Sequence, residues 1–279
     1  MQAIVELGRL ALREARLPHA IHATCIEALT QPGRLFSANP AWSRLFMGWA
    51  DALVGAPYDP FLPAAVACEY LATGYDLIDD VYDLARDSSA RDGLANALPA
   101  GVALLAQEML MQLDVPQVKA KHASVALARA SRRVLAAQAE DYVLRLLPVA
   151  TQGDVLAIMR RRSGTLVTAP CQCAALLAGA PWRVVALAGR FGHALGCAGQ
   201  LEDDLADRVE DRSSGRKTLP IVLDHLYPSA PEVVEASTWV LIQRFLQEAA
   251  RTLHRLPIGT RTEPLWTLLP PAMHTPSHA

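Results

Sequence analysis

Residues 62–87 read LPAAVACEYLATGYDLIDDVYDLARD, and the character of this stretch changes at its middle. Its first part is apolar around most of a helical circumference, which is typical of a central helix in a large bundle. Its second part, from residue 75, sets five aspartates among large apolar side chains. The stretch therefore predicts a buried helix with a strongly acidic end.

The rest of the chain carries the same helical pattern. Apolar residues recur at spacings of three and four between Pro and Gly breaks, and strand-like alternation is missing, so we predict an all-α fold. The expected helices cover 1–16, 18–30, 41–54, 61–87, 94–113, 116–147, 152–179, 182–212, 219–227, 230–255 and a short segment at 263–270. No linker-like stretch divides the pattern, so residues 1–279 are expected to form a single domain with a Pro-rich C-terminal tail at about 269–279.

Composition argues against several classes of protein. The chain is 52% hydrophobic and 19% charged, with a net charge of -2 and scattered arginines, so it offers no electrostatic footprint for nucleic acid. Five cysteines are an odd number in apolar helical contexts, which indicates a reducing compartment. The N-terminal residues lack the uninterrupted apolar core of a signal peptide, and no window reaches the roughly 18 apolar residues of a membrane span. We expect a soluble, cytoplasmic protein.

Two acidic clusters share one spacing. The first forms D-D-x-x-D with Asp79, Asp80 and Asp83. The second, within GQLEDDLADRVED at 199–211, forms it with Asp203, Asp204 and Asp207. On a helix the first and last aspartates of each motif lie one above the other, with the middle one beside them. Each predicted helix therefore carries an acidic stripe near its C-terminal end.

These stripes are electrostatically unfavourable without a cation. Like charges at i and i+4 repel, and carboxylates near a helix C-terminus each forfeit roughly 0.3–1 kcal/mol against the helix dipole. A solvated surface would explain one such cluster, but it explains two clusters of identical spacing poorly. Carboxylates at this spacing suit Mg²⁺, which takes one or two of them and completes its shell with water and phosphate. A substrate with a diphosphate head and a hydrocarbon tail would suit both the acids and the apolar helices.

At these motifs the chain resembles the polyprenyl synthetase family of trans-isoprenyl diphosphate synthases. The resemblance spans roughly residues 45–225, with LATGYDLIDDVYD similar to the first aspartate-rich motif of the family and FGHALGCAGQLEDDLAD similar to the second. The segment AAQAED at 136–141 resembles the Gly-Gln-x-x-Asp motif, and RRSGTLVTAPCQCAALLAGA resembles the segment that opens with Lys-Thr. The loop GRKTLP at 215–220 resembles Gly-Lys-x-Thr-Leu-Pro. The paired aspartate motifs carry the specificity.

The resemblance implies the isoprenoid synthase fold, a single antiparallel bundle of about ten helices around a deep central cavity. It implies three Mg²⁺ ions that bridge the aspartates to an allylic prenyl diphosphate, whose ionisation releases diphosphate. The implied metal ligands are Asp79, Asp80, Asp83 and Asp203, with Asp204 and Asp207 supporting ligation directly or through water. The implied substrate-binding residues are Arg91, Gln138, Asp141, Arg162, Gln200, Arg216 and Lys217. A homodimer is implied by the resemblance alone.

The chain also departs from the family pattern. The N-terminal Gly-Lys-x-x-Arg-Pro motif, which holds isopentenyl diphosphate, has no counterpart in GRLFSANPAWSRLF, where only Arg34 and Arg44 are candidates. The family's Arg-Arg-Gly reads SSARDG, which keeps Arg91 alone. The lysine of Lys-Thr is Arg162, and the loop lysine is Arg216, with Lys217 next to it. The diphosphate-ionising half of the machinery is thus retained, while the isopentenyl diphosphate site is degenerate.

Three hypotheses follow from this asymmetry. In the first, the enzyme ionises one allylic diphosphate and either transfers the prenyl group or cyclises the cation; Tyr75, one turn before Asp79, would place a ring in the tail cavity and favour a substrate of about ten to fifteen carbons. In the second, the chain is an ordinary elongating synthase whose isopentenyl diphosphate site is rebuilt from Arg34, Arg44 and Arg91. In the third, it is a non-catalytic regulatory subunit, which the retention of both aspartate motifs disfavours.

Overall fold

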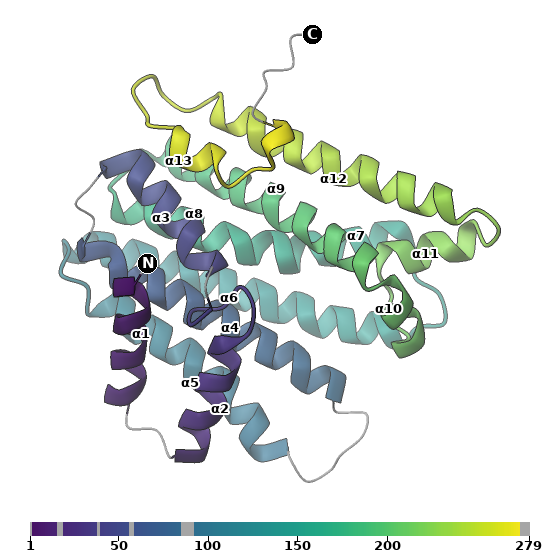
Figure 1. Ribbon diagram of the computed structural model, residues 1–279, viewed down its shortest axis with the longest axis horizontal. Coiled ribbons are helices and arrows are strands. Elements are labelled where there is room, and N and C mark those ends of the chain that lie inside the picture. The colour runs from purple at the N-terminus through teal and green to yellow at the C-terminus, as the bar shows by residue number, and fades with distance from the viewer. Residues whose placement is uncertain (1, 16–18, 38–39, 56–58, 85–91, 274–279) are drawn as a thin grey trace. The chain divides into compact units, whose positions relative to one another are not determined.

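The computed structural model describes residues 2–15, 19–37, 40–55, 59–84 and 92–273, without the side chains of residues 20, 21, 24 and 79–100. Within these ranges the regular structure is helical and no strand occurs, so the all-α prediction is confirmed (Figure 1). The α-helices are α1 (Gln2–Glu14), α2 (His19–Thr30), α3 (Ala41–Val54), α4 (Leu62–Leu84), α5 (Asp92–Met111), α6 (Gln117–Leu146), α7 (Gln152–Met159), α8 (Thr165–Leu177), α9 (Trp182–Ala206), α10 (Arg208–Ser214), α11 (Leu219–Leu226), α12 (Pro231–Leu253) and α13 (Glu263–Trp266). Short 3₁₀ turns cover Asp59–Phe61 and Pro271–Met273.

Two helices that were predicted to be continuous are each interrupted in the structure. The helix expected at 152–179 is interrupted by a π-helical segment, Arg160–Gly164, between α7 and α8. The helix expected at 182–212 breaks at Asp207, whose ψ of 8° leaves the helical region, so that α10 starts as a separate element. An apolar repeat cannot reveal either break. The π-helical segment adds one residue to a turn, which hardly changes the periodicity, and at Asp207 the i, i−4 hydrogen bonds continue on both sides of the break. The end of the helix expected at 61–87 lies partly outside the described residues.

The chain divides into two compact units. The first comprises Met1–Ala128, Ala169–Val185 and Gly259–Leu268, and the second comprises Arg129–Thr168, Ala186–Ile258 and Leu269–Ala279. Helices α6, α8 and α9 contribute residues to both units. The expectation of a single domain stays a prediction.

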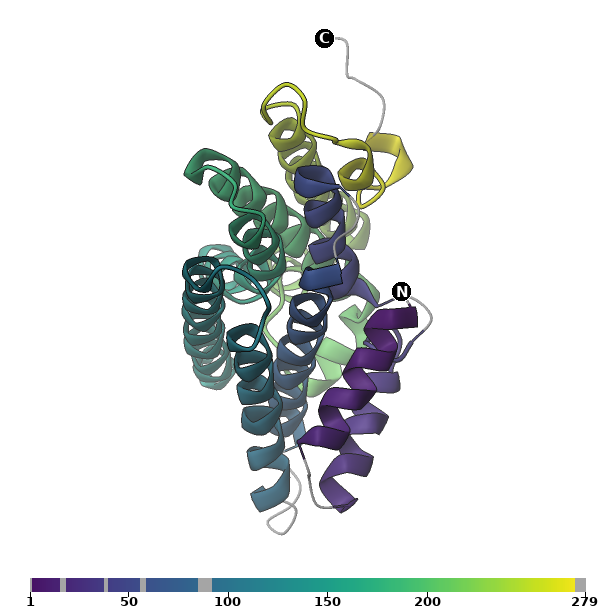
Figure 2. The same ribbon diagram turned by 90° about the vertical axis from the view of Figure 1, so that its left-hand side faces the viewer.

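Helix α4 is the centre of the first unit. It packs along α5 and also contacts α1, α2 and α3 (Figures 1 and 2). Every residue from 64 to 75 is buried, which confirms that this part of the opening stretch is a central helix. The hydroxyl of Tyr70, itself fully buried, donates a hydrogen bond to the carbonyl of Gly8 and ties α1 to α4.

A buried carboxylate joins α3 to α4. Glu69 is fully buried, and its Oε1 accepts hydrogen bonds from the backbone N–H of Ser43 at 2.7 Å and from the Ser43 hydroxyl at 2.8 Å. Burial raises the pKa of Glu69 to about 7, although the hydrogen bonds from Ser43 oppose this rise. The contact therefore depends on the protonation state of Glu69 near neutral pH.

In the second unit, α9 and the π-helical segment meet at two glycines. A Cβ on Gly164 would lie 2.6 Å from the ring of His193, and a Cβ on Gly196 would lie 2.3 Å from the carbonyl oxygen of Ser163. Real Cβ atoms do not approach other atoms this closely. Gly196 therefore lets α9 approach the backbone of the π-helical segment, and Gly164 leaves room for the side chains of His193 and Cys197.

The rest of the second unit is built from the later helices. Helix α11 contacts α7, α10 and α12, and the 3₁₀ turn at Pro271–Met273 lies against α12. None of the helices in the described ranges has the length and hydropathy needed to cross a membrane.

We predict that Glu69→Gln makes stability less dependent on pH. The folded pKa of about 7 lies above that of an unfolded glutamate, so the wild type loses stability as the pH rises from about 4.5 through 7. A neutral glutamine at this position does not ionise. Between pH 5 and pH 8 the free energy of unfolding should therefore fall by on the order of 2–3 kcal/mol more in the wild type than in the variant.

Urea denaturation at both pH values measures this difference. The exposed Glu232 provides the control, because Glu232→Gln should leave the pH dependence of the wild type in place. Equal pH dependence in the wild type and Glu69→Gln would refute the assignment.

We also predict opposite effects for two alanine substitutions on α9. Gly196→Ala should lower the free energy of unfolding by about 1–3 kcal/mol, because the new methyl group meets the carbonyl of Ser163. Gly199→Ala should preserve stability or raise it by about 0.5–1 kcal/mol, because a Cβ there has no atom within 4 Å and alanine favours the helix. Chemical denaturation of both variants tests the prediction, and equal stability would contradict the close contact.

Candidate active site

The first aspartate motif lies at the C-terminal end of α4. The backbone of Asp79, Asp80 and Asp83 is helical, as predicted, and the side chains of all three lie outside the described residues. Arg91 also lies outside the described residues. Tyr75, one turn before the motif, is 7% exposed and belongs to the buried part of α4.

An ion pair precedes the first motif. The guanidinium of Arg34 pairs with the carboxylate of Asp76, three residues before Asp79. Arg34 is one of the two arginines that the sequence offers for a rebuilt isopentenyl diphosphate site, and the other, Arg44, is partly buried on α3. In the structure the charge of Arg34 is therefore engaged by a carboxylate on α4.

The second motif spans the break between α9 and α10. Asp203 and Asp204 lie on the last turn of α9, and Asp207 precedes α10, with its N–H bonded to the carbonyl of Asp203 at 2.8 Å. Asp203 and Asp207 are exposed, whereas Asp204 is buried. Desolvation, and then the charge of Asp207, raise the pKa of Asp203. A cation at this end of α9 would relieve that repulsion.

Asp204 ends a chain of side-chain hydrogen bonds. The Ser163 hydroxyl donates to Gln200 Oε1 at 2.6 Å, and Gln200 Nε2 donates to Asp204 Oδ1 at 2.8 Å. Burial raises the pKa of Asp204 to about 7, while Gln200 and the charge of Arg162 lower it. These two hydrogen bonds couple the π-helical segment to the second motif, next to the glycine contact described above. Ser163 was not predicted as a site residue, although its place after Arg162 in the Lys-Thr-like segment was a signal.

Three consecutive arginines of the π-helical segment have three different partners. Arg160 lies over the ring of Phe245 at 5.8 Å, and Arg161 pairs with Glu140. Arg162 Nη1 lies 3.4 Å from both Gln138 Oε1 and Asp141 Oδ2, which is long for a hydrogen bond. The extra residue of a π turn changes the directions of successive side chains.

The structure therefore brings several predicted substrate-binding residues together in the second unit. Arg162 lies beside Gln138 and Asp141, and its charge reaches Asp204. Arg145 was missed by the sequence analysis: its guanidinium donates to Asp141 Oδ2 at 2.7 Å from the next turn of α6. The i, i+4 spacing of an aspartate and an arginine was the available signal.

The loop with the other two predicted cations connects α10 to α11. Gly215 turns the chain with φ of 74°, and the N–H of Arg216 donates to the carbonyl of Asp211 at 3.0 Å. The Arg216 side chain, 29% exposed, has its Nε 3.8 Å from Asp211 Oδ1. Lys217 is partly exposed at the next position. The loop thus presents two cations, nine and ten residues after Asp207.

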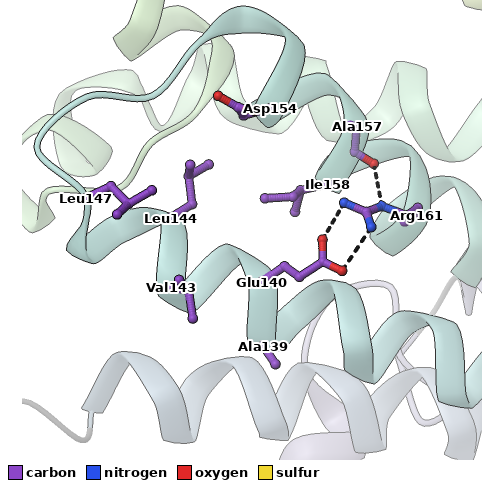
Figure 3. Close-up of a pocket in the computed structure, with 9 residues that line it drawn as sticks. All are labelled: Ala139, Glu140, Val143, Leu144, Leu147, Asp154, Ala157, Ile158 and Arg161. Carbon is purple, nitrogen blue, oxygen red and sulfur yellow. Dashed lines mark hydrogen bonds and ion pairs between the residues drawn. The ribbon is translucent and has the colours of Figure 1, made fainter.

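A separate pocket of about 400 Å³ lies between α6 and α7 (Figure 3). Its lining is mostly apolar, with the Glu140–Arg161 ion pair at one end. The lining residues are Ala139, Glu140, Val143, Leu144, Leu147, Asp154, Ala157, Ile158 and Arg161. It contains none of the predicted site residues.

The carboxylates of the second motif meet part of what Mg²⁺ requires. Within the described side chains, no three His, Cys, Asp or Glu residues gather into a complete metal site. Asp203 and Asp207 fit a Mg²⁺ ion that takes one or two carboxylates and fills its shell with water and phosphate. Asp204, held by Gln200, fits a supporting role.

Relatives of known identity match part of the chain. The (2E,6E)-farnesyl diphosphate synthase of Mycobacterium tuberculosis is 33% identical over 194 residues, which cover 62% of this chain and 53% of that protein. The geranylgeranyl diphosphate synthase of Methanosarcina mazei is 27% identical over 195 residues, which cover 62% of this chain and 59% of that protein. The chain therefore spans between half and two thirds of the length of these relatives.

Solved structures share the fold. Geranylgeranyl pyrophosphate synthase from Lactobacillus brevis has a TM-score of 0.77 at 20% identity, covering 95% of this chain and 93% of its own. Polyprenyl synthase from Caulobacter crescentus, complexed with calcium and isoprenyl diphosphate, has a TM-score of 0.77 at 20% identity, covering 96% and 93%. The predicted isoprenoid synthase fold is thus confirmed. The family model for polyprenyl synthetase matches residues 43–221, more than half of the sequence, and the chain belongs to the polyprenyl synthetase family.

Proposed function

We propose that this chain is a Mg²⁺-dependent prenyltransferase that ionises an allylic prenyl diphosphate and transfers the prenyl group. The hydrogen-bonded chain from Ser163 through Gln200 to Asp204 carries the proposal, because it couples a cation-bearing segment to an aspartate motif within one unit. The relatives named above as farnesyl and geranylgeranyl diphosphate synthases support the reaction class. The family resemblance supports a homodimer, and the odd number of cysteines in apolar helical contexts supports a cytoplasmic location. Both stay predictions.

Each part of the site has a role in this proposal. The six aspartates of the two motifs would hold Mg²⁺, which supplies Lewis-acid stabilisation of the departing diphosphate. Arg162, Arg216 and Lys217 would bind phosphate oxygens, since guanidinium groups bind them in a forked geometry and ammonium groups as point charges. Gln200 keeps Asp204 oriented, and Gln138 and Asp141 orient Arg162.

The hydrocarbon tail of the substrate is assigned to the apolar part of α4. Tyr75 lies one turn before Asp79 and is buried, so a ring there would limit the length of the tail. We propose an allylic substrate of about ten to fifteen carbons on this basis.

A second candidate function is cyclisation without isopentenyl diphosphate. The pairing of Arg34 with Asp76 favours it, because a guanidinium that neutralises a neighbouring carboxylate offers less free charge to a second diphosphate. The lack of a Gly-Lys-x-x-Arg-Pro motif points in the same direction. The two candidates share the ionisation step and differ in what captures the cation.

Product analysis separates the two candidates. We predict that purified protein with Mg²⁺ and geranyl or farnesyl diphosphate releases diphosphate, and that mass spectrometry of extracts identifies the acceptor. Longer prenyl diphosphates formed only when isopentenyl diphosphate is added would establish elongation. Hydrocarbons or terpene alcohols from one substrate alone would establish cyclisation, and no release from any allylic diphosphate would refute the proposal in favour of a regulatory subunit.

We predict that Asp203→Ala lowers diphosphate release by roughly 100-fold or more, because a metal ligand that stabilises the leaving group is lost. Asp79→Ala should have the same effect. The neighbouring Glu202 is also exposed on α9 but lies outside the motif, so Glu202→Ala should keep most of the activity. Circular dichroism monitors the fold of each variant, and unchanged turnover in Asp203→Ala would exclude this residue as a metal ligand.

A further inference from the structure

A buried carboxylate on α11 receives two arginines from α10. Asp224 is 9% exposed, and its Oδ2 accepts a hydrogen bond from Arg208 Nε at 3.0 Å. A second nitrogen of Arg208 bonds Oδ1, and the guanidinium of Arg212 bonds Oδ2. These bonds, from Arg208 first, lower the pKa of Asp224 against the opposing effect of burial. Asp224 is therefore an ionised anchor for both arginines.

The position of this anchor connects it to the proposed site. Helix α10 starts immediately after Asp207 of the second aspartate motif and ends at Ser214, with Gly215 as its C-cap. Residues 215–218 then lead into α11 and include Arg216 and Lys217. The carboxylate of Asp224 thus links the helices on both sides of this loop. With Arg208 and Arg212 bound to Asp224, the two ends of the loop are held at a fixed separation.

We infer that Asp224 is a positioning residue for diphosphate binding. Through Arg208 and Arg212 it holds the loop that carries Arg216 and Lys217 at a fixed distance from the second aspartate motif. The inference rests on the proposed function, because it assigns these two cations to the diphosphate. It adds a residue that touches neither substrate nor metal but sets the affinity for the substrate.

The net charge of the Asp224 cluster distinguishes a positioning role from a purely electrostatic one. Asp224, Arg208 and Arg212 together carry a net charge of one positive unit, and Asp224→Asn would raise it to two. If the cluster acted only through its electrostatic potential, this variant would bind a diphosphate more tightly. A positioning role predicts weaker binding instead, because the loop is no longer held.

Binding of inorganic diphosphate in the presence of Mg²⁺, measured by calorimetry on the full chain, tests the inference. We expect Asp224→Asn to raise the dissociation constant about tenfold, with a comparable rise in KM for the allylic diphosphate and a smaller change in kcat. Asp224→Glu, which keeps the carboxylate, should restore part of the affinity. Amide hydrogen exchange of residues 212–220 should become faster in Asp224→Asn.

The chain offers a matched control and a milder variant. Asp51 on α3 also pairs with an arginine, Arg261, at 3.0 Å within the first unit, so Asp51→Asn should leave diphosphate affinity unchanged. Arg212 is 64% exposed, so Arg212→Gln removes its bond to Asp224 without burying a new polar group. Arg208 still bonds Asp224, so we expect a smaller rise in the dissociation constant. This variant decides the question if Asp224→Asn fails to fold.

The possible outcomes are distinct. Unchanged or tighter diphosphate binding in folded Asp224→Asn, or in Arg212→Gln when Asp224→Asn does not fold, would overturn the positioning role and leave the proposed function intact. A wild-type chain that neither binds diphosphate nor turns over an allylic diphosphate would refute the proposed function, and the affinity role of Asp224 with it.

Discussion

The candidate site in the second unit depends on the close packing of the π-helical segment against α9, which Gly164 and Gly196 permit. Because neither residue has a Cβ, the π-helical segment approaches α9 more closely than packed side chains would allow. That approach places the Ser163 hydroxyl within 2.6 Å of Gln200, which in turn holds Asp204. The candidate site is therefore built on a steric property of two glycines.

In the second unit, several carboxylates that are removed from water lie close to arginines. Buried or partly buried carboxylates there have arginines nearby: Asp141 has Arg145, Asp211 has Arg216, and Asp224 has Arg208. Such pairing offsets the cost of removing carboxylates from water. Asp203 and Asp207 differ, because they remain exposed and the charge of Asp207 raises the pKa of Asp203. The unfavourable acids are thus concentrated where a divalent cation is expected.

Much of the fold could be predicted from the sequence, because the spacing of apolar residues indicates which face of each helix is buried. The apolar circumference of residues 64–75 identified α4 as a central helix, and the Pro and Gly breaks placed most of the helix ends within a few residues. The breaks at Arg160–Gly164 and Asp207 were missed, because a π turn and a single non-helical backbone conformation both leave the apolar repeat uninterrupted. For the proposed site, motifs in the sequence pointed to Gln138, Asp141, Arg162 and Gln200, whereas Arg145, Ser163 and Asp224 emerged only from contacts in the structure.

The sequence by itself determined the helical class, which depends on the spacing of apolar residues along each helix, and the family, which depends on the order of its motifs along the chain. Only the tertiary structure decided which side chains from different helices are partners. It paired Arg34 with Asp76 and coupled Ser163 through Gln200 to Asp204, and it brought Arg208 and Arg212 to Asp224. The physical reason is that a hydrogen bond or ion pair requires a separation of a few ångströms, and between helices this separation is fixed by packing rather than by spacing along the chain.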